Sequence, residues 1–121
     1  SFPIFQTRPR ECIQNELQRL GITKRYRGYT QVLFAIEMAL ENEECLQNVT
    51  ERVYKVVASQ CRCDPSWVER NIRTISHVAW KTNRTHLRNI AGYPLYAFPA
   101  ASEFISIMTA YLQRARETQA R

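Results

Sequence analysis

The stretch DPSWVERNIRTISHVAWK, residues 64–81, decides how the chain is organised. Asp64 followed by Pro65 is a strong helix start, because an aspartate accepts a hydrogen bond from a free backbone N–H and proline suits the first helical position. At about 100° per residue, four apolar side chains fall within roughly 60° of one another. They are Val68, Ile72, Ile75 and Ala79. We therefore expect a helix over residues 65–82 with one buried stripe.

The opposite side of this helix is basic and polar. It carries Ser66, Arg70, Arg73, His77 and Lys81, with Glu69 and Trp80 on one flank and Trp67 and Val78 on the other. A helix that is apolar on one side and offers cations and hydrogen-bonding groups on the other has what a helix in a DNA major groove requires. The alternative is a solvated surface helix, since charged outer faces are common. The neighbouring sequence favours the DNA-binding interpretation.

The composition indicates one folded domain with an anionic partner. Of the 121 residues, 45% are hydrophobic and 11% are aromatic, which excludes a disordered chain. Lysine and arginine number 17 against 11 aspartate and glutamate, a net charge of +6. This charge favours nucleic acid or another anionic surface. The longest apolar window, residues 32–40, is interrupted by Glu37 and is far shorter than the ~20 residues of a membrane span, so no membrane partner is expected.

The cysteines do not have the spacing of a metal site. The four are Cys12, Cys45, Cys61 and Cys63, and only the last two are close, with a single residue between them. This spacing matches no common zinc-ligand pattern. We expect reduced thiols that pack as small apolar side chains, with no metal and no other cofactor.

Apolar residues at helical intervals predict five further helices and no strand. Their ranges are about 10–20, 29–40, 49–60, 84–91 and 102–116. The expected fold is therefore all-α, a six-helix, bundle-like domain over residues 10–121, preceded by a linker or tail at residues 1–9. A basic loop between the first two helices contains Lys24 and Arg25, which are candidates for phosphate contacts.

The third and fourth helices, residues 49–60 and 65–82, make a helix-turn-helix candidate. Asn48 and Glu51 have the spacing of a capping box at the start of the third helix. Ala58 supplies the small residue needed where the two helices cross, and the cysteine pair that follows supplies apolar groups to the turn. The apolar positions of the third helix are Val49, Val53, Val56 and Val57.

The run V-E-R-x-I-R-x4-V-A-W, from Val68 to Trp80, resembles the recognition helix of the C-terminal effector domain of the stage 0 sporulation protein A family. The resemblance covers roughly residues 13–112. It implies a helix-turn-helix domain that binds double-stranded DNA in pairs, in the cytoplasm of a bacterium and on its nucleoid. Further landmarks in matching order are Leu20-Gly21, Gly28-Tyr29, Gly92-Tyr93 and Ser102-Glu103-Phe104-Ile105.

Carried over residue by residue, the base-reading positions of the family correspond to Glu69, Arg70 and Arg73. Arginine contacts guanine O6 and N7 in a bidentate manner, and glutamate accepts from cytosine N4. Glu69 also precedes Arg73 by four residues, so it either reads a base or aims that guanidinium. Ser66 and the free N–H groups of the first turn are placed to hold a phosphate. The other expected contacts with phosphate or nearby groups come from Trp67, His77, Lys81, Lys24 and Arg25.

Two departures from the family pattern affect this interpretation. Trp67 stands where family members tend to carry a basic residue, which removes one phosphate or base contact and alters the preferred site. The phosphorylatable receiver domain of the family would need another ~120 residues and is absent from this chain. We expect either the effector part of a longer protein or a stand-alone DNA-binding relative.

Two other functions are weighed against DNA binding. A protein-interaction module of the same fold is the alternative, since Trp67 is a typical interface anchor, whereas Arg70 and Arg73 favour DNA. RNA polymerase or its sigma factor is a candidate partner, and Tyr111, Arg114 and Arg116 of the last helix are expected to form a contact surface near the dimer or the polymerase. An enzyme is not expected, because His77 lies on the basic face with no carboxylate or thiol placed beside it.

Overall fold

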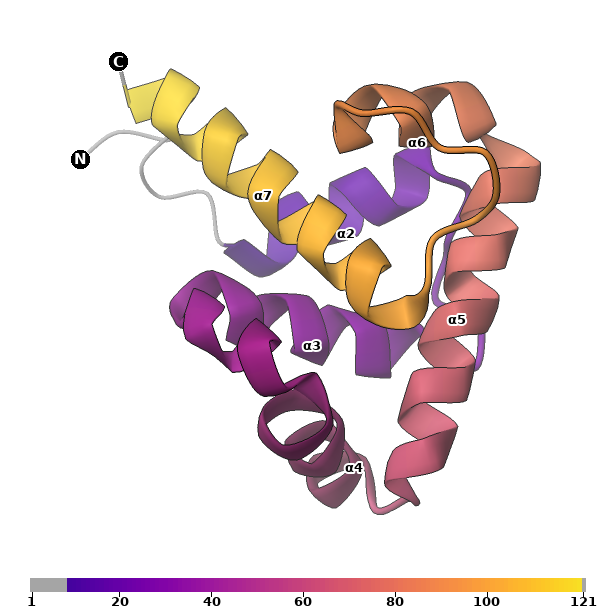
Figure 1. The fold of residues 1–121 in the computed structure, drawn as a ribbon, viewed down its shortest axis with the longest axis vertical. Helices are drawn as coiled ribbons and strands as arrows, with labels where there is room; N and C mark the ends of the chain where they lie inside the picture. The colour runs from indigo at the N-terminus through magenta and orange to yellow at the C-terminus, as the bar shows by residue number, and fades with distance from the viewer. Residues whose placement is uncertain (1–8, 121) are drawn as a thin grey trace.

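The computed structural model describes residues 9–120, and this part of the chain is entirely helical, with loops between the helices (Figure 1). The all-α fold is confirmed, and the described residues contain six α-helices. The α-helices are α2 (Pro9–Arg19), α3 (Tyr29–Glu41), α4 (Lys55–Cys61), α5 (Pro65–Thr82), α6 (Arg84–Ala91) and α7 (Ala101–Ala120). The predicted tail lies outside the described residues except for Pro9, which already belongs to α2. No helix of the described part is long and apolar enough to cross a bilayer.

The core is formed where α3, α5 and α7 meet. Helices α3 and α7 pack against each other, and both pack against α5, while α2 packs on α3 (Figure 1). On α7, Phe104, Ile105 and Met108 are fully buried, and Ile107 is buried with them. Because α5 is anchored from one side only, its opposite face remains available to a partner.

The region before α4 differs from the prediction. A 3₁₀ helix occupies Glu43–Asn48, and it is capped by Asn42, whose side chain accepts from the Glu44 N–H at 3.2 Å. The predicted capping box of Asn48 and Glu51 is therefore wrong. A π-helical turn, Thr50–Tyr54, follows and leads directly into α4.

The buried face of α4 also differs from the prediction at one position. Val56 is 39% exposed, whereas Tyr54 and Ala58 are buried. The reason is that α3 and α5 both pack on the π-helical turn and on α4, and Val56 lies outside the face that they cover. Burial and the negative charge of Glu69 raise the pKa of Tyr54 to about 12.

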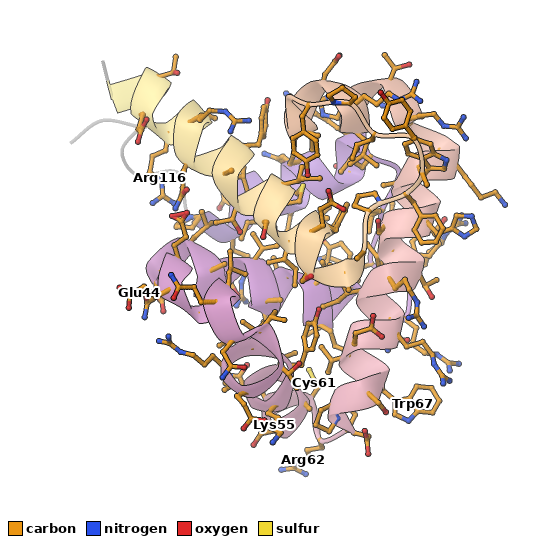
Figure 2. All side chains as sticks on the ribbon, in the orientation of Figure 1. Glu44, Lys55, Cys61, Arg62, Trp67 and Arg116 are labelled. Carbon is orange, nitrogen blue, oxygen red and sulfur yellow. The ribbon has the colours of Figure 1, made fainter. Side chains whose placement is uncertain are left out.

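The third and fourth α-helices, α4 and α5, form the helix-turn-helix. Arg62 ends α4 in the left-handed conformation, with φ 55° and ψ 50°, and the Cys63 N–H donates to the carbonyl of Ala58 at 3.0 Å. Cys61 and Cys63 are partly buried against the core, as expected for apolar groups in the turn. Figure 2 shows Cys61 on the side of α4 that faces α5.

Candidate nucleic-acid interface

The N-terminus of α5 is closed by its own cap. Asp64 Oδ1 accepts from the Ser66 N–H at 2.8 Å and from the Ser66 hydroxyl at 2.7 Å. These bonds lower the pKa of Asp64, so an ionised carboxylate sits at the start of the helix. Both donors of Ser66 are therefore used, and a negative charge occupies the place where a phosphate was expected. The phosphate contact assigned to Ser66 would first have to displace Asp64.

The inner face of α5 is the predicted stripe. Val68, Ile72, Ile75 and Ala79 are buried, each with at most 1% of its surface exposed. Sequence reasoning missed Ser76, which is also fully buried. Its hydroxyl donates to the carbonyl of Pro99 at 2.7 Å and thereby ties the loop before α7 to α5.

The first half of the outer face holds two arginines, each steadied by a neighbour on the same helix. The Arg73 Nη1 donates to Glu69 at 3.3 Å, an ion pair between residues four apart on the helix. The guanidinium carbon of Arg70 lies 5.5 Å from the ring centroid of Trp67. Trp67 is 45% exposed and projects away from the body of the protein (Figure 2). Both arginines are exposed and pre-oriented on one side of α5.

His77 and Lys81 continue the outer face toward the C-terminus of α5, and both are exposed. The ring of His77 lies 4.7 Å from the ring of Phe98, centroid to centroid. Phe98 belongs to the loop over residues 92–100. Leu95 is buried there, but Tyr96 is 89% exposed. Only part of this loop therefore faces the core.

The basic loop between α2 and α3 lies along the other flank of α5. An added Cβ on Gly21, whose φ is +83°, would overlap the side chain of Thr82. A Cβ on Gly28 would lie 2.8 Å from the Cβ of Asn71. Both ends of the loop thus contact α5, and in Figure 1 the loop passes behind α5 while the loop after α6 crosses in front. Lys24 and Arg25 are exposed in the middle of this loop, where they line a hollow together with Gln14 and Gln18 of α2.

Other candidate chemistry is not assembled in the described part of the chain. Among residues 9–120, no group of three or more His, Cys, Asp or Glu side chains is arranged to hold a metal ion, and the four cysteines are free thiols. His86 Nε2 lies 2.7 Å from Oε1 of buried Glu16, so it links α6 to α2. Sequence reasoning gave no role to Arg84 and Arg88, which lie against Trp80 just beyond α5.

Comparison with known proteins gives one family match. A family model described as "Sporulation initiation factor Spo0A C terminal" matches residues 13–112. The matched range begins in α2 and ends in α7, and it contains the whole helix-turn-helix and both loops that flank α5.

Proposed function

The chain belongs to the Spo0A C-terminal family of sporulation regulators, and from this premise we propose that α5 reads base pairs in the major groove. The members of this family are DNA-binding transcription-factor domains and not enzymes. The observation that carries the proposal is the division of α5 into two faces. One face is buried in the core, and the other presents exposed Arg70 and Arg73, each in contact with a neighbour on the same helix. A recognition helix needs both properties, because base readout requires side chains whose orientation is set before binding.

We assign base readout to Arg70 and Arg73, each through a bidentate contact with guanine. Glu69 aims Arg73 and reads a base as well, because a carboxylate has about four acceptor positions and Arg73 uses only part of them. The two functions considered for Glu69 are therefore compatible. The cation–π contact with Trp67 plays the corresponding part for Arg70.

Phosphate contacts are proposed on both sides of this reading face. Lys24 and Arg25 supply them from the loop that runs along one flank of α5, and Lys81 and His77 supply them from its C-terminal half. Such contacts fix the position of a protein on the duplex without reading sequence. Ser66 is the weakest candidate for a phosphate contact, because its N–H and its hydroxyl already donate to Asp64.

We further propose that the domain binds as a homodimer on paired half-sites, in the bacterial cytoplasm on the nucleoid, because one α5 offers a small groove contact. RNA polymerase or its sigma factor remains a proposed partner of α7. Exposed Arg116 suits such a contact. Arg114 is partly engaged within the domain, since its Nη2 donates to the carbonyl of Ile90 at 3.1 Å.

A second candidate function is a protein-interaction module, which the exposure of Trp67 and Tyr96 favours. Fluorescence anisotropy separates the two functions. The domain is titrated against a labelled duplex with the consensus box of the sporulation regulator and against a scrambled duplex, at two salt concentrations. DNA readout predicts binding to the box alone, weakening with salt by a slope of about −0.9 per phosphate contact. Equal, weak binding to both duplexes would contradict it and favour the protein partner.

A further inference from the structure

Two arginines outside the reading face share one tryptophan. Trp80 lies at the C-terminal end of α5 and is only 9% exposed. The guanidinium carbon of Arg84 lies 4.3 Å from the Trp80 ring centroid, and that of Arg88 lies 5.2 Å from the same centroid. The arginines are four residues apart on α6, so they project from the same side of that helix.

Each of these side chains is anchored by a backbone carbonyl as well as by the indole. The Nε–H of Arg84 donates to the carbonyl of Trp80 at 3.4 Å, and the Nε–H of Arg88 donates to the carbonyl of Leu95 at 3.1 Å. These bonds use only the Nε–H of each guanidinium, so the Nη groups remain available to a ligand. The guanidinium groups of Arg84 and Arg88 are therefore held in place while their Nη–H donors stay free. This arrangement lowers the entropic cost of binding a ligand.

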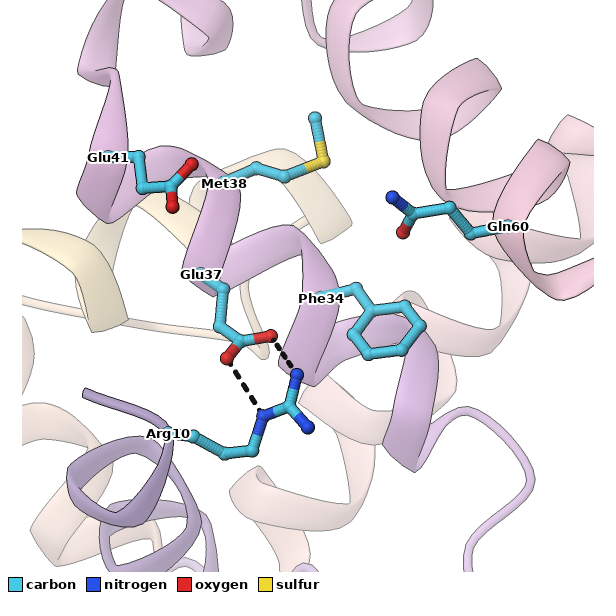
Figure 3. A pocket seen from close by; sticks show the side chains of 6 residues that line it. All are labelled: Arg10, Phe34, Glu37, Met38, Glu41 and Gln60. Atoms are coloured by element: carbon cyan, nitrogen blue, oxygen red, sulfur yellow. Dashed lines mark hydrogen bonds and ion pairs between the residues drawn. The ribbon is translucent and has the colours of Figure 1, made fainter. Parts of the chain in front are cut away.

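No carboxylate of the described residues balances these charges. Within residues 9–120, neither Arg84 nor Arg88 forms a salt bridge, and the first turn of α6 contains no acidic residue. Arg10 is a useful contrast, because it also lies over an aromatic ring, that of Phe34, at 5.7 Å. Figure 3 shows that Glu37 binds Arg10 through two hydrogen bonds of 2.9 Å. Arg10 is thus neutralised inside the domain, whereas the Arg84–Arg88 pair has no such anion.

We propose that Arg84 and Arg88 together bind a phosphate group of the DNA backbone. The proposal rests on the proposed function, because it takes the first half of α5 to lie in the major groove. Ten residues separate Arg70 from Trp80, a rise of about 15 Å, while the groove is about 12 Å wide. The end of α5 that carries Trp80 therefore reaches the sugar–phosphate backbone. Guanidinium pairs suit this ligand, since phosphate oxygens accept bidentate hydrogen bonds.

The test compares Arg84→Gln and Arg88→Gln with Arg10→Gln, which removes the same charge from an arginine that Glu37 already neutralises (Figure 3). Figure 2 shows that Arg116, at the far end of α7, lies away from α6, and this residue is left unchanged. Anisotropy titrations against the consensus and scrambled duplexes are made at several salt concentrations, and a thermal melt of each variant verifies folding. We expect each of the first two variants to weaken binding to both duplexes by a similar factor, with the salt slope reduced by up to about 0.9. Arg10→Gln should leave both quantities unchanged. Unchanged slopes for the folded Arg84 and Arg88 variants would overturn the proposal.

If a variant is unstable, DNA duplexes that carry one uncharged backbone group provide a second test. A duplex with one methylphosphonate, moved stepwise along each strand beside the box, should weaken binding of the wild-type domain at one flanking position and have no effect on the variants there. Uniform tolerance by the wild type would overturn the proposal. Inorganic phosphate at constant ionic strength should compete weakly with DNA, and strong competition that disappears in the variants would identify a free-phosphate site instead. Failure of the proposed function itself would appear differently, as equal binding of the two duplexes by the wild type.

Discussion

The inner and outer faces of α5 differ in what holds their side chains. On the inner face, Ile72 and its neighbours are fixed by many apolar contacts with several helices. On the outer face, each guanidinium is fixed by one neighbour on α5 itself, Glu69 for Arg73 and Trp67 for Arg70. Core contacts are cooperative, whereas a single exposed pair contributes little to stability. The two faces should therefore respond to substitution in different assays, which makes the difference between them measurable.

The largest expected effect is on the inner face. Ile72→Ala should lower the free energy of unfolding by about 2–5 kcal/mol, because it leaves a cavity under a fully buried side chain. Denaturant unfolding followed by circular dichroism measures this decrease. Thr74→Ala is the control on the exposed side, where a change within ~0.5 kcal/mol is expected. Equal decreases for the two variants would contradict the division into faces.

Removal of Arg70 or Arg73 should weaken DNA binding and leave the free energy of unfolding nearly unchanged. Arg70→Ala and Arg73→Ala should each weaken binding to the consensus duplex by about 1–3 kcal/mol, with stability within ~0.5 kcal/mol of the wild type. Anisotropy titrations and thermal melts on the same samples give both numbers. A variant that binds as tightly as the wild type removes that arginine from the base-reading set.

A smaller effect is expected from the aromatic neighbour of Arg70. Trp67→Ala should weaken specific binding by about 0.5–1 kcal/mol, the range of an exposed cation–π contact, and Trp67→Phe should restore part of it. In the Arg70→Ala background, Trp67→Ala should have little further effect, because the two residues act as one unit. Full additivity of the two effects would show instead that Trp67 contacts DNA by itself.

The flanking loop should affect affinity but not discrimination. Lys24→Gln and Arg25→Gln should weaken binding to the consensus and scrambled duplexes by the same factor, and each should reduce the salt slope by about 0.9 if its side chain binds one phosphate. The ratio of the two dissociation constants is the quantity to follow, with Arg10→Gln as the charge-matched control. A change in that ratio would show that the loop reads sequence.

The smallest effect is expected at Asp64, which caps the N-terminus of α5. The folded-state pKa of Asp64 is below its ordinary value of 3.8, so its contribution to stability is complete above the unfolded pKa and is lost as the pH falls through the folded pKa. Asp64→Asn keeps an acceptor but no charge. Its melting temperature should therefore fall less steeply than that of the wild type below pH ~4. If the melting temperatures of the wild type and of Asp64→Asn decreased equally at low pH, the result would contradict a charged cap.

Features set by local sequence could be predicted. Asp64 and Pro65 start α5, Gly92 ends α6 at the expected residue, and the apolar stripe of α5 follows directly from helical periodicity. The pair of Glu69 and Arg73 also follows from spacing alone, because side chains four residues apart on a helix are neighbours.

Features set by tertiary packing could not be predicted. The π-helical turn and α4 both pack against α5, and the exposure of Val56 depends on that packing. At the site, Ser66 was expected to face a phosphate, but it faces Asp64 because the cap competes for the same donors. The stacking of Arg84 and Arg88 on Trp80 depends on the angle between two helices, which sequence spacing does not contain.

The most direct measurement is a cycle that pairs Arg70→Ala and Arg73→Ala with single base-pair changes across the consensus box. The wild-type domain should lose about 1–3 kcal/mol at each guanine that is read. The predicted result is that Arg70→Ala becomes insensitive to changes at one base pair and Arg73→Ala at another, with all remaining discrimination intact. Both variants keeping the wild-type pattern of discrimination at every base pair would contradict the account that the outer face of α5 reads DNA.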